Sequence, residues 1–115
     1  MKRLIVVGGA GSLEVKPGVA LLDTPEFPAV AMEEATAGRE TFNVLKQQND
    51  LEWTFLSPSA MIGPGDRTGK FRLGKDQLLV GADGKSRISY PDYAIALVDE
   101  LEKRAHIRQR FTVGY

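Results

Sequence analysis

The residues best suited to chemistry lie near the start of the chain, where the apolar segment Leu4–Val7 runs into the glycine-rich segment Gly8–Ser12. A buried parallel strand brings its backbone to a ligand at its carboxyl end in this way. The first chemistry to test is the binding of a dinucleotide pyrophosphate, which needs G-x-G-x-x-G at the start of a helix. Gly9 and Gly11 supply the first two glycines, but Glu14 occupies the third position.

The residues after Gly11 also disagree with this fingerprint. Val15-Lys16-Pro17-Gly18 breaks a helix. Val19–Asp23 is typical of a strand that ends in an acid, but the segment before it is too short for a crossover, which needs roughly 10–12 residues with its helix. We therefore favour a strand-to-loop turn in which glycine supplies positive φ over a phosphate-binding turn.

A second apolar segment, Trp53–Leu56, runs directly into Ser57–Met61, and residues 29–48 between the two segments have helical periodicity. The order strand, helix, strand predicts a βαβ unit with parallel strands. Because parallel strands end at the same edge of a sheet, we expect Gly8–Ser12 to face Ser57–Met61 where open α/β sheets bind ligands. The small and apolar stripe of the helix is expected at Ala31, Ala35, Gly38, Phe42 and Leu45.

The second half of the chain predicts smaller elements. Residues 71–73 and 78–80 are expected to form two short strands, which would make a small β-hairpin insertion. Ser89 is the expected N-cap of a helix that ends near Lys103. A last strand is expected over residues 108–113. The buried stripe of the second helix is expected at Ala94, Leu97, Val98 and Leu101.

The composition limits the function classes. The chain has 115 residues, enough for one domain, and its 15 basic and 15 acidic residues give no net charge, which argues against a nucleic-acid surface. The absence of cysteine excludes disulfides and thiolate chemistry, and the single histidine, His106, excludes a multi-histidine metal site. No segment has the length of a membrane span or the pattern of a signal peptide, so we expect a cytoplasmic protein that binds no membrane.

Three blocks of sequence, RLIVVGGAGS, WTFLSPSAMIGPGDRTGKFRLG and RISYPDYAIALVDELE, occur in this order. Together they resemble the carboxyl-terminal half of an atypical short-chain dehydrogenase, in the NAD(P)H-binding NmrA-like group that includes NADH-flavin reductases and biliverdin-IX-beta reductase. The resemblance implies an α/β, partial Rossmann-like fold, the carboxyl-terminal half of a doubly wound parallel sheet. Residues 1–115 would form a single partial NAD(P)-binding domain that lacks the amino-terminal, phosphate-binding half.

The resemblance also implies which residues line the nicotinamide and substrate end of the site. Ser12 is the candidate catalytic residue, since its hydroxyl could donate a hydrogen bond to a substrate carbonyl. The alternative is a turn serine that bonds its own backbone. The candidate cofactor-binding residues are Gly8, Gly9, Ala10, Pro58, Ser59, Ala60 and Met61.

The Tyr-x-x-x-Lys pair of ordinary short-chain dehydrogenases is missing, because none of Tyr90, Tyr93 and Tyr115 has a lysine four residues later. This suits the flavin-reductase-like branch, in which the protein mainly holds two rings in stacking order.

Two functions follow from these observations. The first is the substrate and nicotinamide side of an NAD(P)H-dependent reductase, acting on a small molecule such as a flavin-like ring and inactive as this chain alone. NAD(P)H would then be the cofactor of the full-length family, with or without binding to this chain, which would need its missing half or form a homo-oligomer. The second is a non-catalytic module that homodimerises through its exposed sheet edge.

Overall fold

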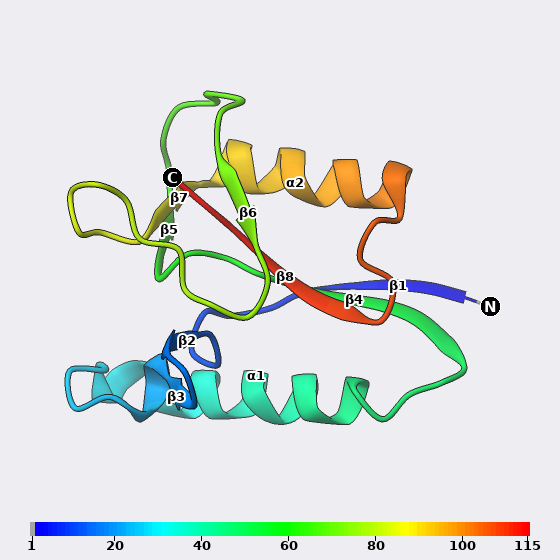
Figure 1. Ribbon diagram of the computed structural model, residues 1–115, viewed down its shortest axis with the longest axis horizontal. Helices are drawn as coiled ribbons and strands as arrows, with labels where there is room; N and C mark the ends of the chain where they lie inside the picture. The colour runs from blue at the N-terminus through cyan, green and yellow to red at the C-terminus, as the bar shows by residue number, and fades with distance from the viewer. Residues whose placement is uncertain (1) are drawn as a thin grey trace.

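The computed structural model describes residues 2–115 and places four strands in one sheet (Figure 1). Their order is β1 (Lys2–Val7), β4 (Leu51–Ser57), β8 (Gln109–Gly114) and β6 (Arg72–Gly74). β1, β4 and β8 are parallel, as the βαβ pattern predicts, and β6 runs antiparallel to β8. β4 and β8 lie inside the sheet, which explains why their residues are buried almost without a break. The α/β class and the partial parallel sheet are thus confirmed.

Two helices cover opposite faces of this sheet (Figure 1). A 3-10 turn, η2 (Ala29–Ala31), leads into α1 (Met32–Leu45), so the predicted helix over 29–48 is present but shorter. Phe42 and Leu45 of α1 pack on Trp53 and Phe55 of β4. The Phe42 and Leu45 end of the predicted stripe therefore meets the sheet.

The second helix, α2 (Tyr90–Lys103), begins where the sequence predicts, since the Ser89 side chain accepts a hydrogen bond from the Asp92 N–H. Of its predicted buried stripe, Leu97 packs against the core, but the other three residues are wrong, because Ala94 is exposed, Val98 is 47% exposed and Leu101 is 53% exposed. The buried residues of the helix are Asp92, Tyr93, Ala96 and Glu100.

Hydrogen bonds and ion pairs to distant residues explain why α2 buries this face and not the apolar stripe. The Tyr93 hydroxyl donates to the Leu56 carbonyl at 2.8 Å, and burial raises the pKa of Tyr93. Glu100 accepts from Arg3 at 2.8 Å and pairs with His106. Hydrophobic periodicity alone does not reveal such partners, because they come from distant parts of the chain.

The remaining elements are short. β2 (Glu14–Lys16) and β3 (Val19–Ala20) form an antiparallel hairpin, followed by the 3-10 turn η1 (Leu21–Asp23). β5 (Met61–Gly63) pairs in parallel with β7 (Arg87–Ser89).

Two of the smaller predicted strands differ from the structure. Residues 78–80 form no strand, so the hairpin predicted at 71–80 is wrong, and the antiparallel hairpin lies at residues 14–20 instead. The backbone of residues 76–78 instead forms hydrogen bonds with β2. The Glu14 N–H donates to the Asp76 carbonyl, and the Leu78 N–H donates to the Glu14 carbonyl. The predicted strand over Val19–Asp23 is divided between β3 and η1.

Within residues 2–115, none of the helices has the length and apolar character required to cross a membrane. The same residues contain no group of three or more histidine, aspartate or glutamate side chains arranged to hold a metal ion.

Candidate functional site

A cavity of about 800 Å³ opens at the carboxyl ends of β1 and β4. The predicted segment Gly8–Ser12 forms one side of it together with residues 58–62, which overlap the predicted segment Ser57–Met61, and residues 24–28 with the first turns of α1 form the other side. We call it the strand-end cavity. All eight predicted site residues line it, namely Gly8, Gly9, Ala10, Ser12, Pro58, Ser59, Ala60 and Met61. The parallel pairing of β1 with β4 brings the two segments together, whereas the chemical roles of these residues remain predictions.

The glycine loop is shaped by close packing. A Cβ atom on Gly8 would lie 2.2 Å from the Phe55 ring, and one on Gly11 would lie 2.7 Å from the Ala35 Cβ. Neither glycine has positive φ, so the expectation that glycine supplies positive φ in this turn is wrong. A Cβ on Gly9 would meet nothing within 4 Å. The backbone at Gly9 is therefore open to a flat group in the cavity.

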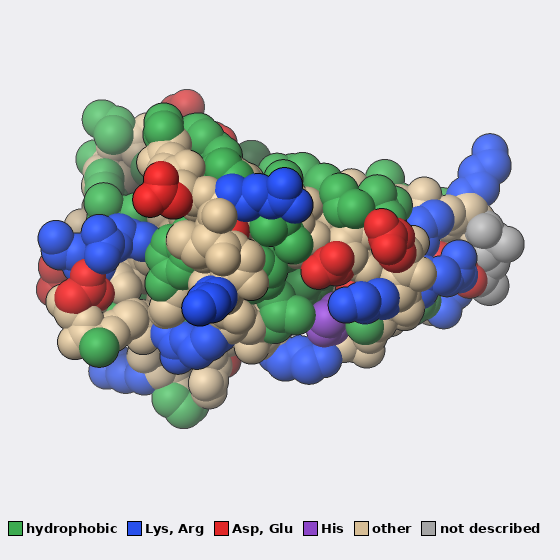
Figure 2. Space-filling model, turned by 90° about the horizontal axis from the view of Figure 1, so that it is seen from above, with side chains coloured by type: hydrophobic (Ala, Val, Ile, Leu, Met, Phe, Trp, Pro, Cys, Tyr) green, Lys and Arg blue, Asp and Glu red, His purple; other side chains and the backbone are tan. Residues whose placement is uncertain are grey.

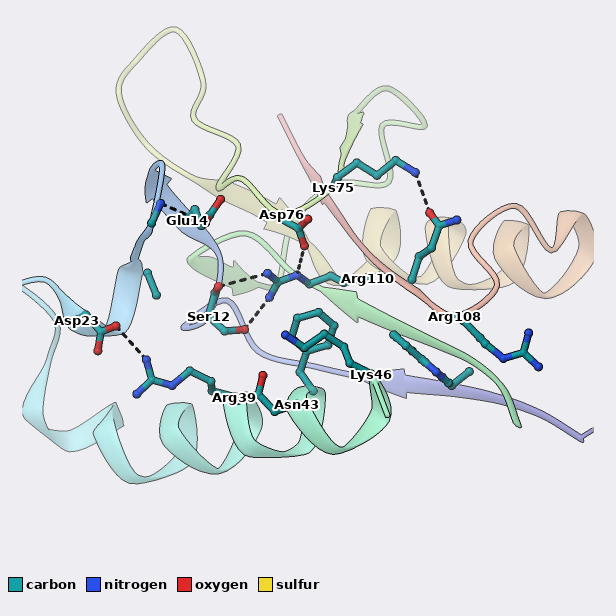
Figure 3. Close-up of a pocket in the computed structure, with 15 residues that line it drawn as sticks. Ser12, Glu14, Asp23, Arg39, Asn43, Lys46, Lys75, Asp76, Arg108 and Arg110 are labelled. Atoms are coloured by element: carbon teal, nitrogen blue, oxygen red, sulfur yellow. Dashed lines mark hydrogen bonds and ion pairs between the residues drawn. The ribbon is translucent and has the colours of Figure 1, made fainter. Parts of the chain in front are cut away.

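Ser12 is held by a buried arginine that the sequence analysis did not single out (Figure 3). Arg110 donates from Nη1 to Ser12 Oγ at 2.6 Å and from Nη2 to the Ser12 carbonyl at 3.3 Å. Because Ser12 Oγ accepts the bond from Arg110, the Ser12 hydroxyl proton can point to another acceptor. This arrangement is compatible with the predicted hydrogen bond from Ser12 to a ligand.

Arg110 is only 6% exposed and has two further partners. Its Nε donates to Asp76 at 3.1 Å, and its guanidinium lies 4.3 Å from the centre of the Phe42 ring. Burial lowers the pKa of Arg110, and Asp76 opposes that effect. The alternation of β8 places Arg110 on the α1 side of the sheet, but no spacing in the sequence connects it to Ser12.

In the second segment that lines the cavity, residues 58–61, the polar groups are mostly bonded within the fold. The Ser59 hydroxyl is buried and donates to the Val113 carbonyl at 2.8 Å. The Ala60 N–H donates to Ser86 Oγ at 3.0 Å, and Met61 begins β5 with an exposed side chain. Because the Ser59 hydroxyl is occupied, the predicted contact of this segment with a ligand would fall mainly to its backbone and to Met61.

The loop over Asp66–Thr68 is bound to α2. The buried Asp92 carboxylate accepts from the N–H groups of Thr68 and Gly69, from the Thr68 hydroxyl and from the Tyr115 hydroxyl. Burial acts to raise the pKa of Asp92, but these hydrogen bonds outweigh it and keep the pKa below its ordinary value. Asp92 therefore joins the loop, the helix and the last residue.

His106, the single histidine, belongs to a charged cluster at the amino ends of the strands. Its Nδ1 lies 2.7 Å from Glu100 Oε1, and its ring stacks on Phe111 with centroids 4.1 Å apart. Glu100 is also paired with Arg3. These contacts account for His106 as a structural residue far from the strand-end cavity.

The known proteins that this chain resembles match it over nearly its whole length. No protein-family model matches the chain. The curated protein YwnB of Bacillus subtilis, which is uncharacterised, is 51% identical over 114 residues, covering 96% of this chain and 54% of YwnB. The chain thus spans about half the length of the curated relative it matches.

Solved structures give the same coverage. A "putative exported protein" of Burkholderia pseudomallei is 52% identical with a TM-score of 0.95, covering 99% of this chain and 55% of that one. A "putative NADH-flavin reductase" of Streptococcus pneumoniae is 43% identical with a TM-score of 0.92, covering 97% and 55%. A "putative epimerase" of Bacteroides thetaiotaomicron is 45% identical with a TM-score of 0.96, covering 99% and 53%.

A more distant structure, a short-chain dehydrogenase/reductase of Veillonella parvula in complex with NADP, is 20% identical with a TM-score of 0.73. The match covers all of this chain and 51% of the Veillonella parvula chain. At 20% identity it supports the fold alone.

Proposed function

Since the chain is an NmrA-like fragment of the atypical short-chain dehydrogenases, about half the length of its relatives, we propose that it forms the nicotinamide and substrate side of an NAD(P)H-dependent reductase. The observation that carries this proposal is the strand-end cavity of about 800 Å³. It lies at the carboxyl ends of parallel strands, where open α/β sheets bind ligands. The related Streptococcus pneumoniae protein bears the name of an NADH-flavin reductase.

The shape of the glycine loop supports a flat ligand. The open backbone at Gly9 and the apolar side chains of Phe27, Ala35 and Met61 offer a surface to a ring. Gly11 is followed by the β2–β3 hairpin, so this loop has no helix N-terminus to hold a pyrophosphate. We assign the pyrophosphate to the part of the relatives' length that this chain does not cover.

The residues of this chain would mainly bind and orient. NAD(P)H supplies a hydride when it is bound, and the acceptor we propose is a small molecule with a flat, flavin-like ring. Gly8, Gly9 and the 58–61 backbone would hold the rings close together, which lowers the entropic part of the barrier. Ser12, oriented by Arg110, would donate its hydroxyl hydrogen bond to a carbonyl of the acceptor.

Saturation-transfer NMR with millimolar NADPH tests this proposal, because it detects weak binding to a half site. We expect transfer to the nicotinamide protons and little to the adenine protons. Gly9→Val adds a side chain to the cavity lining at a position where a Cβ atom meets nothing within 4 Å, and it should abolish the transfer. Gly63→Val is the matched control, since a Cβ there also meets nothing and Gly63 does not line the cavity. Absence of transfer, or equal transfer with Gly9→Val, would refute the proposal.

A second function, a non-catalytic homodimer, is favoured by one specific observation. β1 lies at the edge of the sheet, and Val7 on it is 66% exposed. An unpaired apolar edge strand readily pairs with another chain. Light scattering over a range of concentrations would detect a dimer, and Leu4→Lys on this edge should dissociate it. A dimer that shows no NADPH transfer favours this second function over the first.

A further inference from the structure

The strand-end cavity has charged residues only on the side formed by residues 24–28 and α1. Among the described residues that line it, those with charged side chains are Glu26, Glu34 and Arg39. The remaining lining residues are apolar or uncharged. The charge that the cavity offers to a ligand therefore depends on these three side chains and on what already pairs with them.

Arg39 is the only basic residue in this lining, and its charge is compensated. Its Nη1 donates to the Asp23 carboxylate at 2.9 Å, along the dashed line in Figure 3. Arg110 contacts Ser12 but does not itself line the cavity, and each of its three nitrogens donates to Asp76 or to Ser12. Among the residues that the structure describes, the lining thus has no cation without a counter-charge.

The two glutamates of the lining, in contrast, have no counter-charge. Within residues 2–115, no ion pair joins Glu26 or Glu34 to a basic side chain. Both residues are exposed, so salt weakens their effect on a ligand without removing it. The compensation of Arg39 by Asp23 therefore leaves two negative charges on the cavity lining.

Glu34 also opposes the electrostatic effect of its own helix. The N-terminus of a helix is its positive end and by itself favours an anion. Glu33 and Glu34 lie in the first turn of α1, and Glu34 and Ala35 of that turn line the cavity. Because a carboxylate already occupies the turn, this helix end does not favour a second anion.

We propose that the strand-end cavity selects a flat acceptor that carries no anionic group, with Glu26 and Glu34 as its specificity-determining residues. This inference rests on the reductase function proposed above and narrows its acceptor to an uncharged ring system. A phosphate monoester carries nearly two negative charges at neutral pH, and two uncompensated carboxylates on the same cavity repel it. The pyrophosphate of NAD(P)H escapes this repulsion, since we assign it to the part of the relatives' length that this chain does not cover.

Riboflavin and FMN are the matched probes, because they share one ring system and differ by a single phosphate ester. Quenching of flavin fluorescence at pH 7 and low salt gives both dissociation constants with the whole chain, and saturation transfer to the ring protons gives a second reading. We expect riboflavin to bind about three- to tenfold more tightly than FMN, as for two exposed charges acting over about 10 Å. Added salt should reduce this preference.

Neutral variants locate the source of the selectivity. Glu26→Gln and Glu34→Gln should each strengthen FMN binding about two- to threefold and leave riboflavin binding unchanged. The double variant should bind the two flavins almost equally. Glu33→Gln is the matched control, since it removes the same charge from the same helix turn at a residue that does not line the cavity, and it should keep the preference of the parent chain.

Equal binding of the two flavins by the parent chain, or tighter binding of FMN, would overturn the inference and leave the proposed function standing. An undiminished preference for riboflavin in the double variant would do the same, because the selectivity would then come from other residues. Absence of binding by both flavins would also overturn the inference, and the NADPH saturation transfer described above would then decide the proposed function separately.

Discussion

At the scale of single residues, Arg110 connects parts of the chain that are far apart in sequence. It reaches Ser12 in the glycine loop, Asp76 after β6 and the Phe42 ring of α1. A planar guanidinium can serve all three at once, which an ammonium cannot do.

We expect Arg110→Lys to lower the free energy of unfolding by about 1–3 kcal/mol, because it leaves the part-buried oxygens of Ser12 without their donors. Urea unfolding followed by circular dichroism measures this loss. The exposed Arg67→Lys is the matched control and should change stability by less than about 0.5 kcal/mol. A loss at Arg110 no larger than in the control would mean that the guanidinium geometry is unimportant.

Alanine substitutions at the adjacent residues Gly8 and Gly9 give a direct test of the packing in the glycine loop. Gly8→Ala introduces a methyl group 2.2 Å from a Phe55 ring atom, and overpacking of this kind costs about 1–3 kcal/mol. Gly9→Ala meets nothing within 4 Å and should stay within about 0.5 kcal/mol of the parent chain. Thermal unfolding of both variants compares them directly, and similar melting temperatures would contradict the packing described for Gly8.

At the scale of the elements, Asp92 couples the N-terminus of α2 to the 66–69 loop and to Tyr115. Its pKa is lowered in the folded chain, so the charged carboxylate stabilises the fold at pH values above its ordinary pKa of about 3.9. This contribution should disappear as the pH falls from about 4 through the lower, folded-state pKa.

We therefore expect Asp92→Asn to be less stable than the parent chain at pH 7 and to depend less on pH in acid. Urea midpoints at several pH values between about 2.5 and 7 measure both effects. Parallel curves for the two proteins would show that another group causes the acid sensitivity.

The elements also show how far the sequence predicts the fold. The two strand-to-loop segments, the helix between them and the Ser89 cap follow from periodicity and local chemistry, and they bring all eight predicted site residues to one cavity. The buried face of α2, the burial of Arg110 and the docking of residues 76–78 on β2 depend on partners distant in sequence. Local patterns carry no information about such partners.

At the scale of the whole molecule, apolar surface remains uncovered on α2. Val98 and Leu101 form part of the exposed stripe that periodicity assigns to a core (Figure 2 views the molecule from the side of this helix). Exposed apolar stripes often mark contact with another chain or segment.

Leu101→Glu should leave the stability of the isolated chain within about 0.5 kcal/mol, because the side chain already faces solvent. It should reduce any self-association that involves α2, measured by sedimentation velocity. A large loss of stability without a change in association would indicate that Leu101 packs inside the chain after all.

The topology of the sheet has a kinetic consequence. Every pair of neighbouring strands joins distant residues, as Leu4 with Trp53, Leu56 with Phe111 and Leu73 with Val113. No hairpin within the main sheet can form early, so each pairing must first close a long loop at a cost in chain entropy. Refolding should accordingly take milliseconds to seconds, with β4 as the strand around which β1 and β8 must both assemble.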